Sequence, residues 1–242
     1  MNTLNEYSNY ILPFYAPANF VVKKASGSIV WDTKNKKYID FTAGIATTNL
    51  GHSNKLLSKI INEQTKKLWH LSPLYINEPA VALAKKLCKK TFAEKVFFCN
   101  SGAEAIDGSV KIARKYGISR GNKNKNQIIS FSSAFHGRLL TGIALSNSKA
   151  LQNGFHPLPK GIKNHPYNQI DGLEEKFSEN TCAVVIELVQ WQDGIISANK
   201  KFITALKKLC KKYDALLIVD EVQSGMGRTG TLFSYEKYGF KP

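Results

Sequence analysis

Residues 183–188 (AVVIEL) and residues 216–219 (LLIV) are two short apolar runs, and an amphipathic helical pattern near residues 199–213 lies between them. Apolar runs of this length that alternate with helices are typical of parallel strands with both faces covered. A strand, a crossover helix and a second parallel strand form one such unit. This stretch therefore predicts an α/β fold, with a mainly parallel sheet and helices on both faces.

The same alternation continues towards the N-terminus. Residues 127–131 (QIISF) form a third apolar run, and residues 96–99 (VFFC) form a fourth that precedes a helical pattern over 103–116. Farther back, 28–31 and 37–41 have strand patterns, and apolar spacing predicts helices near 54–69 and 77–90. The polar stretches 121–126 and 164–180 are expected to be loops.

Each of the four apolar runs ends in polar residues. These are residues 100–104 (NSGAE), residues 132–138 (SSAFHGR), Glu187, and the pair Asp220-Glu221. The carboxyl ends of parallel strands meet at one edge of a sheet, and open α/β sheets bind ligands at that edge. The sequence therefore predicts a ligand site built from these four segments.

One of these segments can bind an anion, and another can bind a cation. Ser101, Gly102 and Ala103 open a helix, where free backbone N–H groups and the helix dipole attract anions. Ser101 fits an ordinary N-cap equally well. Asp220 ends an apolar strand, where an unpaired carboxylate is costly, so it needs a cationic partner. A protonated pyridine nitrogen and a structural salt bridge both meet that need.

The segment at 132–138 adds an aromatic ring and a guanidinium group. Phe135 can stack on a flat cofactor or pack in the core. The planar fork of Arg138 suits a substrate carboxylate, although a surface arginine looks the same in sequence. Metal-ligand spacing is absent from His52, His70, His156 and His165, so no metal site is expected.

Composition bounds the partners. The chain has 242 residues and a net charge of +16, but only four of its 34 basic residues are arginine. Nucleic-acid sites favour arginine, so we attribute the lysine excess to codon bias and expect no nucleic acid. The sequence has no apolar run of roughly 20 residues and no signal-peptide pattern, and its cysteines are scattered. We therefore expect a cytoplasmic protein that does not bind membranes.

Taken together, the motifs resemble the class III (fold-type I) pyridoxal-phosphate-dependent aminotransferases, most of all the bacterial acetylornithine/succinyldiaminopimelate type. The matching stretches keep the family's order along essentially the whole chain: 30–32 (VWD), 38–41 (YIDF), 50–52 (LGH), 68–70 (LWH), 97–105 (FFCNSGAEA), 135–138 (FHGR), 220–223 (DEVQ) and 227–230 (GRTG).

The resemblance implies a cofactor, pyridoxal 5'-phosphate, and a role for each matching residue. Ser101, Gly102 and Ala103 would hold the phosphate, and Phe135 would stack on the pyridine ring. Asp220 would pair with the ring nitrogen, next to Glu221 in the same motif. Val222 would pack on the ring and Gln223 would reach its phenolic oxygen. Arg138 would bind the substrate α-carboxylate, and Glu187, the first glutamate of the family's EPIQGEGG stretch, is also assigned to the substrate.

The resemblance further implies an activity and an organisation. A homodimer would transfer an amino group between N-acetylornithine and 2-oxoglutarate in arginine biosynthesis, or act on succinyldiaminopimelate in lysine biosynthesis. Residues 1–45 would contribute to the small domain, and 46–242 would form an incomplete large domain that ends before the Schiff-base lysine. We therefore expect this chain alone to be inactive. A non-catalytic binding module is the alternative.

One stretch departs from the family pattern. Where the family has EPIQGEGG, residues 187–194 are ELVQWQDG, so Trp191 replaces a glycine and Gln192 replaces a glutamate. A bulky indole where the backbone must approach closely is expected to cause a clash.

Overall fold

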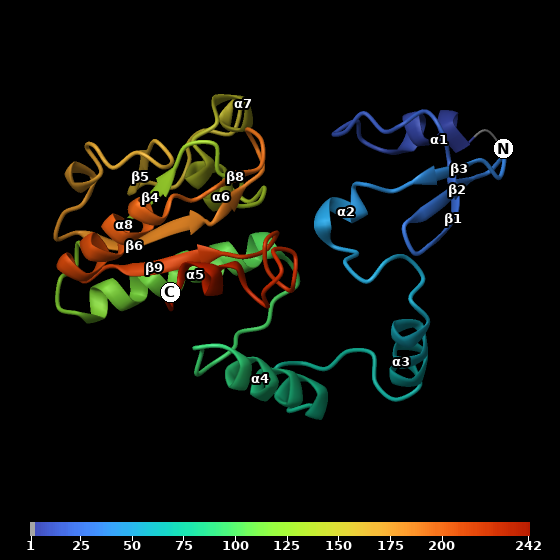
Figure 1. Ribbon diagram of the computed structural model, residues 1–242, viewed down its shortest axis with the longest axis horizontal. Coiled ribbons are helices and arrows are strands. Elements are labelled where there is room, and N and C mark those ends of the chain that lie inside the picture. Colours follow the sequence, from blue (N-terminus) through green and yellow to red (C-terminus); the bar gives the residue numbers. More distant parts are fainter. Residues whose placement is uncertain (1–2) are drawn as a thin grey trace. The chain divides into compact units, whose positions relative to one another are not determined.

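The computed structural model describes residues 3–242, which divide into two compact units between Leu83 and Ala84 (Figure 1). The N-terminal unit contains α1 (Thr3–Tyr10), β1 (Val22–Ser26), β2 (Ile29–Asp32), β3 (Lys37–Ile39), α2 (Ala43–Ala46) and α3 (Lys55–Thr65). Helix α4 (Glu78–Lys90) crosses the division. The predicted division after residue 45 refers to the domains of a complete enzyme and stays a prediction.

The C-terminal unit contains the predicted parallel sheet. Its elements are α5 (Gly102–Ser119), β4 (Gln127–Phe131), α6 (Leu140–Ser146), α7 (Lys149–Gln152), β5 (Ile162–His165), η1 (Glu174–Lys176), β6 (Thr181–Glu187), β7 (Val189–Gln190), β8 (Ile196–Ser197), α8 (Lys200–Lys212), β9 (Leu216–Asp220) and η2 (Ser234–Tyr238). The strand order is β5-β4-β6-β9, and every pair is parallel. The α/β prediction is confirmed.

Alternation along the strands builds a core on each face of this sheet. Ile129 and Val184 pack in one cluster with Phe202 of α8, whereas their neighbours Ile128 and Ala183 pack in the other with α5. Successive strand side chains point to opposite faces, so two covered faces require continuous apolar runs. This is the pattern seen in the sequence.

One predicted strand is wrong, and one strand escaped prediction. Residues 96–99 form no strand, because within the described chain they make no backbone hydrogen bonds to a neighbouring strand. β5 lay in a stretch read as a loop from residue 164 on. As an edge strand it pairs only with β4 and tolerates polar side chains: Asn164 donates to the Ser130 hydroxyl and the Leu145 carbonyl.

The N-terminal unit is organised differently. Strands β1, β2 and β3 form an antiparallel sheet, which confirms the two predicted strands, and the predicted helices correspond to α3 and α4. The Asp32 carboxylate holds the β2–β3 turn by accepting hydrogen bonds from the backbone of Lys34 and Lys36, both at 2.8 Å. Asp32 is the only buried residue described before Leu83.

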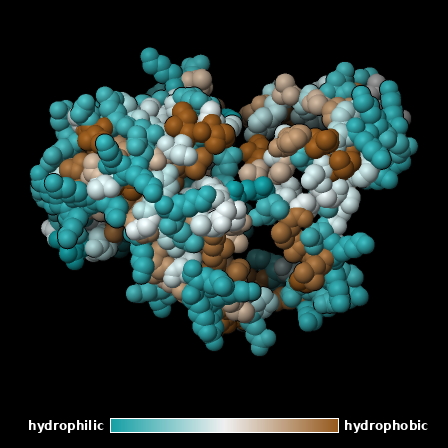
Figure 2. Space-filling model, in the orientation of Figure 1, coloured by the Kyte–Doolittle hydropathy of each residue, from teal (hydrophilic) through white to brown (hydrophobic). Residues whose placement is uncertain are grey.

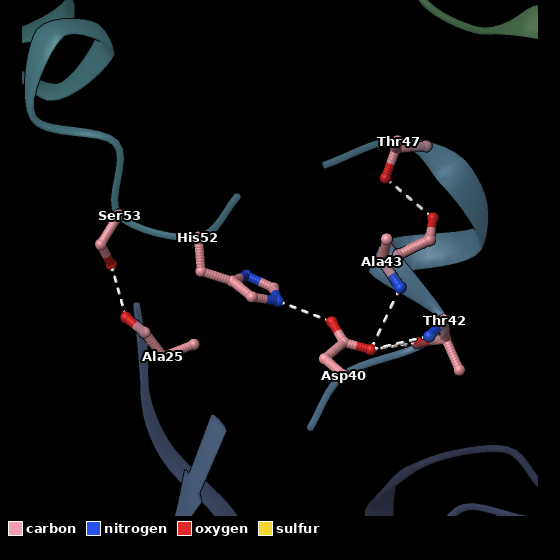
Figure 3. A network of polar contacts seen from close by, with 8 residues as sticks. Ala25, Asp40, Thr42, Ala43, Thr47, His52 and Ser53 are labelled. Atoms are coloured by element: carbon pink, nitrogen blue, oxygen red, sulfur yellow. Dashed lines mark hydrogen bonds and ion pairs between the residues drawn. The ribbon is translucent and has the colours of Figure 1, made fainter. Parts of the chain in front are cut away.

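A polar network centred on Asp40 follows this sheet (Figure 3). The Asp40 carboxylate accepts from the backbone N–H groups of Thr42 and Ala43 and lies 2.7 Å from Nε2 of His52. The hydrogen bonds from His52 and Thr42 hold the pKa of Asp40 far below its usual value. The network secures residues 43–46, a turn in which all four residues have positive φ.

Candidate active site

Two buried carboxylates lie side by side at the carboxyl edge of the sheet. Glu187 and Asp220 are paired in register at the ends of β6 and β9 and are 5% and 7% exposed. The loop at 132–138 reaches both of them. The Phe135 backbone N–H donates to Glu187 Oε2 at 2.9 Å, and Nδ1 of His136 lies 2.7 Å from Asp220 Oδ2. The prediction that these segments meet is confirmed by these contacts.

The two carboxylates have different environments. Burial raises the pKa of Glu187 to about 7, and the charge of neighbouring Asp220 adds to the rise, while His136 and the Phe135 N–H oppose it. Asp220 instead has a polar contact at each oxygen: the Val222 backbone N–H donates to Oδ1 at 3.0 Å, and Nδ1 of His136 lies at Oδ2.

His136 is the functional residue that sequence reasoning missed. Its side chain is fully buried, and Nε2 has no hydrogen-bond partner among residues 3–242. The signal was its position between Phe135 and Gly137, where the chain passes the strand ends. A buried imidazole with one nitrogen on Asp220 orients that carboxylate.

The start of α5 has the features of an anion site. Ser101 caps the helix through a capping box with Glu104, whose carboxylate accepts from the N–H groups of Asn100 and Ser101. Gly102 and Ala103 follow, in the first helical turn, where backbone N–H groups have no acceptor within the helix. Their N–H groups are therefore the donors available to a phosphate at this helix start.

Two close approaches bring α5 to the other segments. A Cβ added at Gly102 would lie 2.5 Å from a methyl carbon of Val222, and one added at Gly137 would lie 2.7 Å from the Ala103 Cβ. Gly137 also has a φ of +89°, which favours glycine. Ser101–Ala103 therefore lie against both the 132–138 loop and the chain after β9.

The Phe135 ring has contacts with two neighbours. The Arg138 guanidinium lies 5.7 Å from its centroid, and the Trp191 ring lies 5.5 Å away at 64°, an edge-on contact. Arg138 is exposed, and no carboxylate of the described residues pairs with it. Its guanidinium is thus open to an anionic group of a ligand.

Trp191 contacts the ring of Phe135, and the clash expected at this position stays a prediction. It begins the turn between β7 and β8, which is tied to the loop by a hydrogen bond from the Ser133 hydroxyl to the Asp193 carboxylate. Gln190 Nε2 also donates to the Ser132 carbonyl at 3.1 Å. The indole therefore packs against Phe135 and adds an apolar wall beside Arg138.

The segment after Asp220 divides into two roles. The Glu221 carboxylate accepts from the hydroxyls of Ser224 and Ser234 and from the Tyr235 backbone, so it anchors the C-terminal segment. This geometry gives no support to the predicted cofactor contact of Glu221. Val222 is 64% exposed beside Gly102, as a residue facing a ligand would be, and Gln223 is half-buried.

Comparisons with known proteins agree with this architecture. The family model for class III aminotransferases matches residues 13–242. Among curated relatives, the acetylornithine/succinyldiaminopimelate aminotransferase of Buchnera aphidicola is 47% identical over 99% of this chain, and the succinylornithine transaminase of Photorhabdus laumondii is 45% identical over 98%. The chain spans 59% of the length of each relative.

Solved structures give the same result. The ornithine aminotransferase of Toxoplasma gondii superposes with a TM-score of 0.94 at 26% identity, over 99% of this chain and 57% of that one. The N-acetylornithine aminotransferase of Stenotrophomonas maltophilia has a TM-score of 0.83 at 34% identity, over 99% and 59%. The fold is that of a fold-type I transferase. The chain belongs to the class III aminotransferases, a pyridoxal-phosphate-dependent family.

Proposed function

We propose that this chain carries the pyridoxal-phosphate site of an aminotransferase that moves an amino group between an N-acylated, ornithine-like donor and 2-oxoglutarate. The observation that supports the proposal most is the buried His136–Asp220 pair at the sheet edge; His136 follows Phe135 in the loop, and Gly137 of the same loop lies against Ala103 at the helix start. Anion donors, an aromatic face and a carboxylate are the groups that the phosphate, ring and nitrogen of the cofactor require.

The residues present fit the cofactor, which supplies an aldehyde that reacts with amines and a ring that withdraws electrons. The N–H groups of Gly102 and Ala103 would donate to its phosphate, and Phe135 would offer a flat face to its ring. Asp220, whose two oxygens are contacted by His136 and the Val222 N–H, would stabilise a proton on the ring nitrogen. Val222 would pack on the ring, and Gln223 would bind its phenolic oxygen.

The proposed donor follows from Arg138 and from the relatives. The exposed guanidinium of Arg138 binds the α-carboxylate, and the indole of Trp191 lies on the same aromatic ring. The relatives are named for acetylornithine, succinyldiaminopimelate and succinylornithine, which share an acylated nitrogen.

We also propose that the chain forms a homodimer and that it is located in the cytoplasm. No helix among residues 3–242 is long and apolar enough to cross a membrane.

One observation favours the second candidate, a binding module without turnover. Trp191 lies against Phe135 where the family has a glycine, and the Arg138 guanidinium lies over the same Phe135 ring. A module of this kind would bind the cofactor but would not exchange amino groups.

Titration with pyridoxamine phosphate tests the site. We expect weak, reversible binding by calorimetry. Asp220→Ala should weaken it about tenfold or more, since a charge-assisted contact contributes about 1.5–3 kcal/mol, and Phe135→Ala should weaken it by about threefold to tenfold through loss of ring stacking, worth about 0.5–1.5 kcal/mol. Asp171→Ala and Phe155→Ala, at exposed positions of the same unit, serve as matched controls and should bind as the parent does. Equal affinity in all five proteins, or no binding, contradicts the proposed site.

A further inference from the structure

Glu187 is a buried acid to which the proposed transfer assigns no step. Its carboxylate accepts a hydrogen bond from the backbone of Phe135, and the residue is 5% exposed. A buried carboxylate without a full charge partner is costly. The structure therefore needs a reason for an acid here that a substrate contact does not provide.

The reason lies in how one loop is attached to two strands. Phe135 and His136 are adjacent residues, and they bond to adjacent carboxylates: the Phe135 N–H to Glu187 and the His136 ring to Asp220. Because Glu187 and Asp220 are paired in register, the two attachments act together. The ring of Phe135 and the carboxylate of Asp220 are thus fixed relative to each other through Glu187.

The charged and titratable groups around Glu187 come from three segments. Asp220 approaches from β9 and His136 from the 132–138 loop, while Tyr167, after β5, donates its hydroxyl to the Glu187 carbonyl at 2.8 Å. Burial and Asp220 favour the protonated acid, and His136 opposes it. A change of charge beside Asp220 therefore changes the protonation of Glu187.

We propose that Glu187 is a positioning residue that holds Phe135 for ring stacking and releases its proton to solvent when a cationic ring binds beside Asp220. This rests on the proposed cofactor site. A cation paired with Asp220 offsets the negative potential at Glu187 and favours its carboxylate form. A carboxylate accepts the Phe135 N–H more strongly than a neutral acid does. Binding of the ring thereby tightens the loop that stacks on it.

Two variants of the full chain separate the two roles of Glu187, which are to hold the Phe135 backbone and to release a proton. In Glu187→Gln the amide oxygen still accepts from Phe135, but there is no proton to release; in Glu187→Ala both are lost. Exposed Glu179→Gln is the control. Pyridoxamine phosphate is titrated by calorimetry at pH 7 in buffers of different ionisation enthalpy, which counts the protons exchanged.

We expect the parent and the control to release about half a proton more per ligand than Glu187→Gln, since a group with a pKa near the working pH is about half protonated. Affinity should change less than about threefold in Glu187→Gln and fall about tenfold in Glu187→Ala. Hydrogen exchange at the Phe135 amide should accelerate in the alanine variant but not in the glutamine variant.

The outcomes distinguish this inference from the proposed function. Binding that needs Asp220 and Phe135, with equal proton counts in the parent and Glu187→Gln, overturns the role of Glu187 alone. If hydrogen exchange at the Phe135 amide is unchanged in Glu187→Ala, the role of Glu187 is also overturned. This measurement is possible even if that variant is too unstable for titration. Absence of binding by the parent overturns both proposals.

Discussion

The two units of the chain contain similar amphipathic patterns but use them differently. Both hydrophobic clusters lie in residues 84–242, whereas before Leu83 the described apolar side chains are mostly exposed, such as Phe41 at 91% and Trp69 at 86%. Figure 2 shows apolar residues at the surface of this unit. The C-terminal unit supplies both a sheet and the helices that pack on it, whereas neither hydrophobic cluster includes a residue from 3–83. The apolar pattern of the sequence therefore predicts helices and strands in both units. It predicts buried side chains only in the unit where helices pack on the sheet.

The largest expected difference between the units is the effect of removing a phenylalanine. Phe202 is fully buried, with its ring 5.2 Å from Phe131, and Phe41 is exposed. We expect Phe202→Ala to lower the free energy of unfolding by about 3–5 kcal/mol and Phe41→Ala by less than about 0.5 kcal/mol. Urea denaturation measures both. A large effect at Phe41 would show that residues up to Leu83 have a core of their own, or one shared with a partner.

The second difference is the pH dependence of stability, which has opposite signs for Glu187 in the C-terminal unit and Asp40 in the N-terminal unit. The pKa of Glu187 is raised on folding from 4.5 to about 7, so its ionisation opposes folding. Its contribution to stability should fall as pH rises from 4.5 to 7, by on the order of 2–3 kcal/mol, and stay constant above. Urea titrations across this range, with Glu187→Gln as comparison, measure the slope. An equal slope in both proteins would contradict the prediction.

The smallest expected effect is that of Asp40 in the N-terminal unit. Its pKa is lowered on folding, so it stabilises the fold above its unfolded value of 3.8 and loses this as pH falls through the lower folded value. The protection factors of the Thr42 and Ala43 amides, measured relative to the intrinsic exchange rate at each pH, should fall on acidification, and Asp40→Asn should show this loss of protection already at neutral pH. Amides that stay protected in the variant would mean that another contact holds the turn.

The sequence predicted those features for which a residue pattern is compatible with only one kind of structure. Continuous apolar runs with helices between them predicted the sheet, and polar strand ends predicted which segments meet. Sequence reasoning failed where strand pairing decides the structure: residues 96–99 look like a strand but make no backbone hydrogen bonds to a strand among residues 3–242, and β5 looks polar because it is an edge strand. It also missed His136, because the direction of a side chain depends on the folded backbone.

The turn at residues 43–46 has a consequence for mutational scanning. Ala43, Ile45 and Ala46 adopt positive φ values of 46°, 55° and 65°, which cost an L-residue roughly 1–2 kcal/mol each. In most helices glycine is the residue that a scan marks as harmful. Here the ranking is inverted: glycine at Ala43 or Ile45 relieves the backbone. Replacing Gly44 brings a new Cβ to 2.5 Å from the Thr47 hydroxyl oxygen. A substitution table trained on right-handed helices would therefore rank every change in this turn in the wrong order.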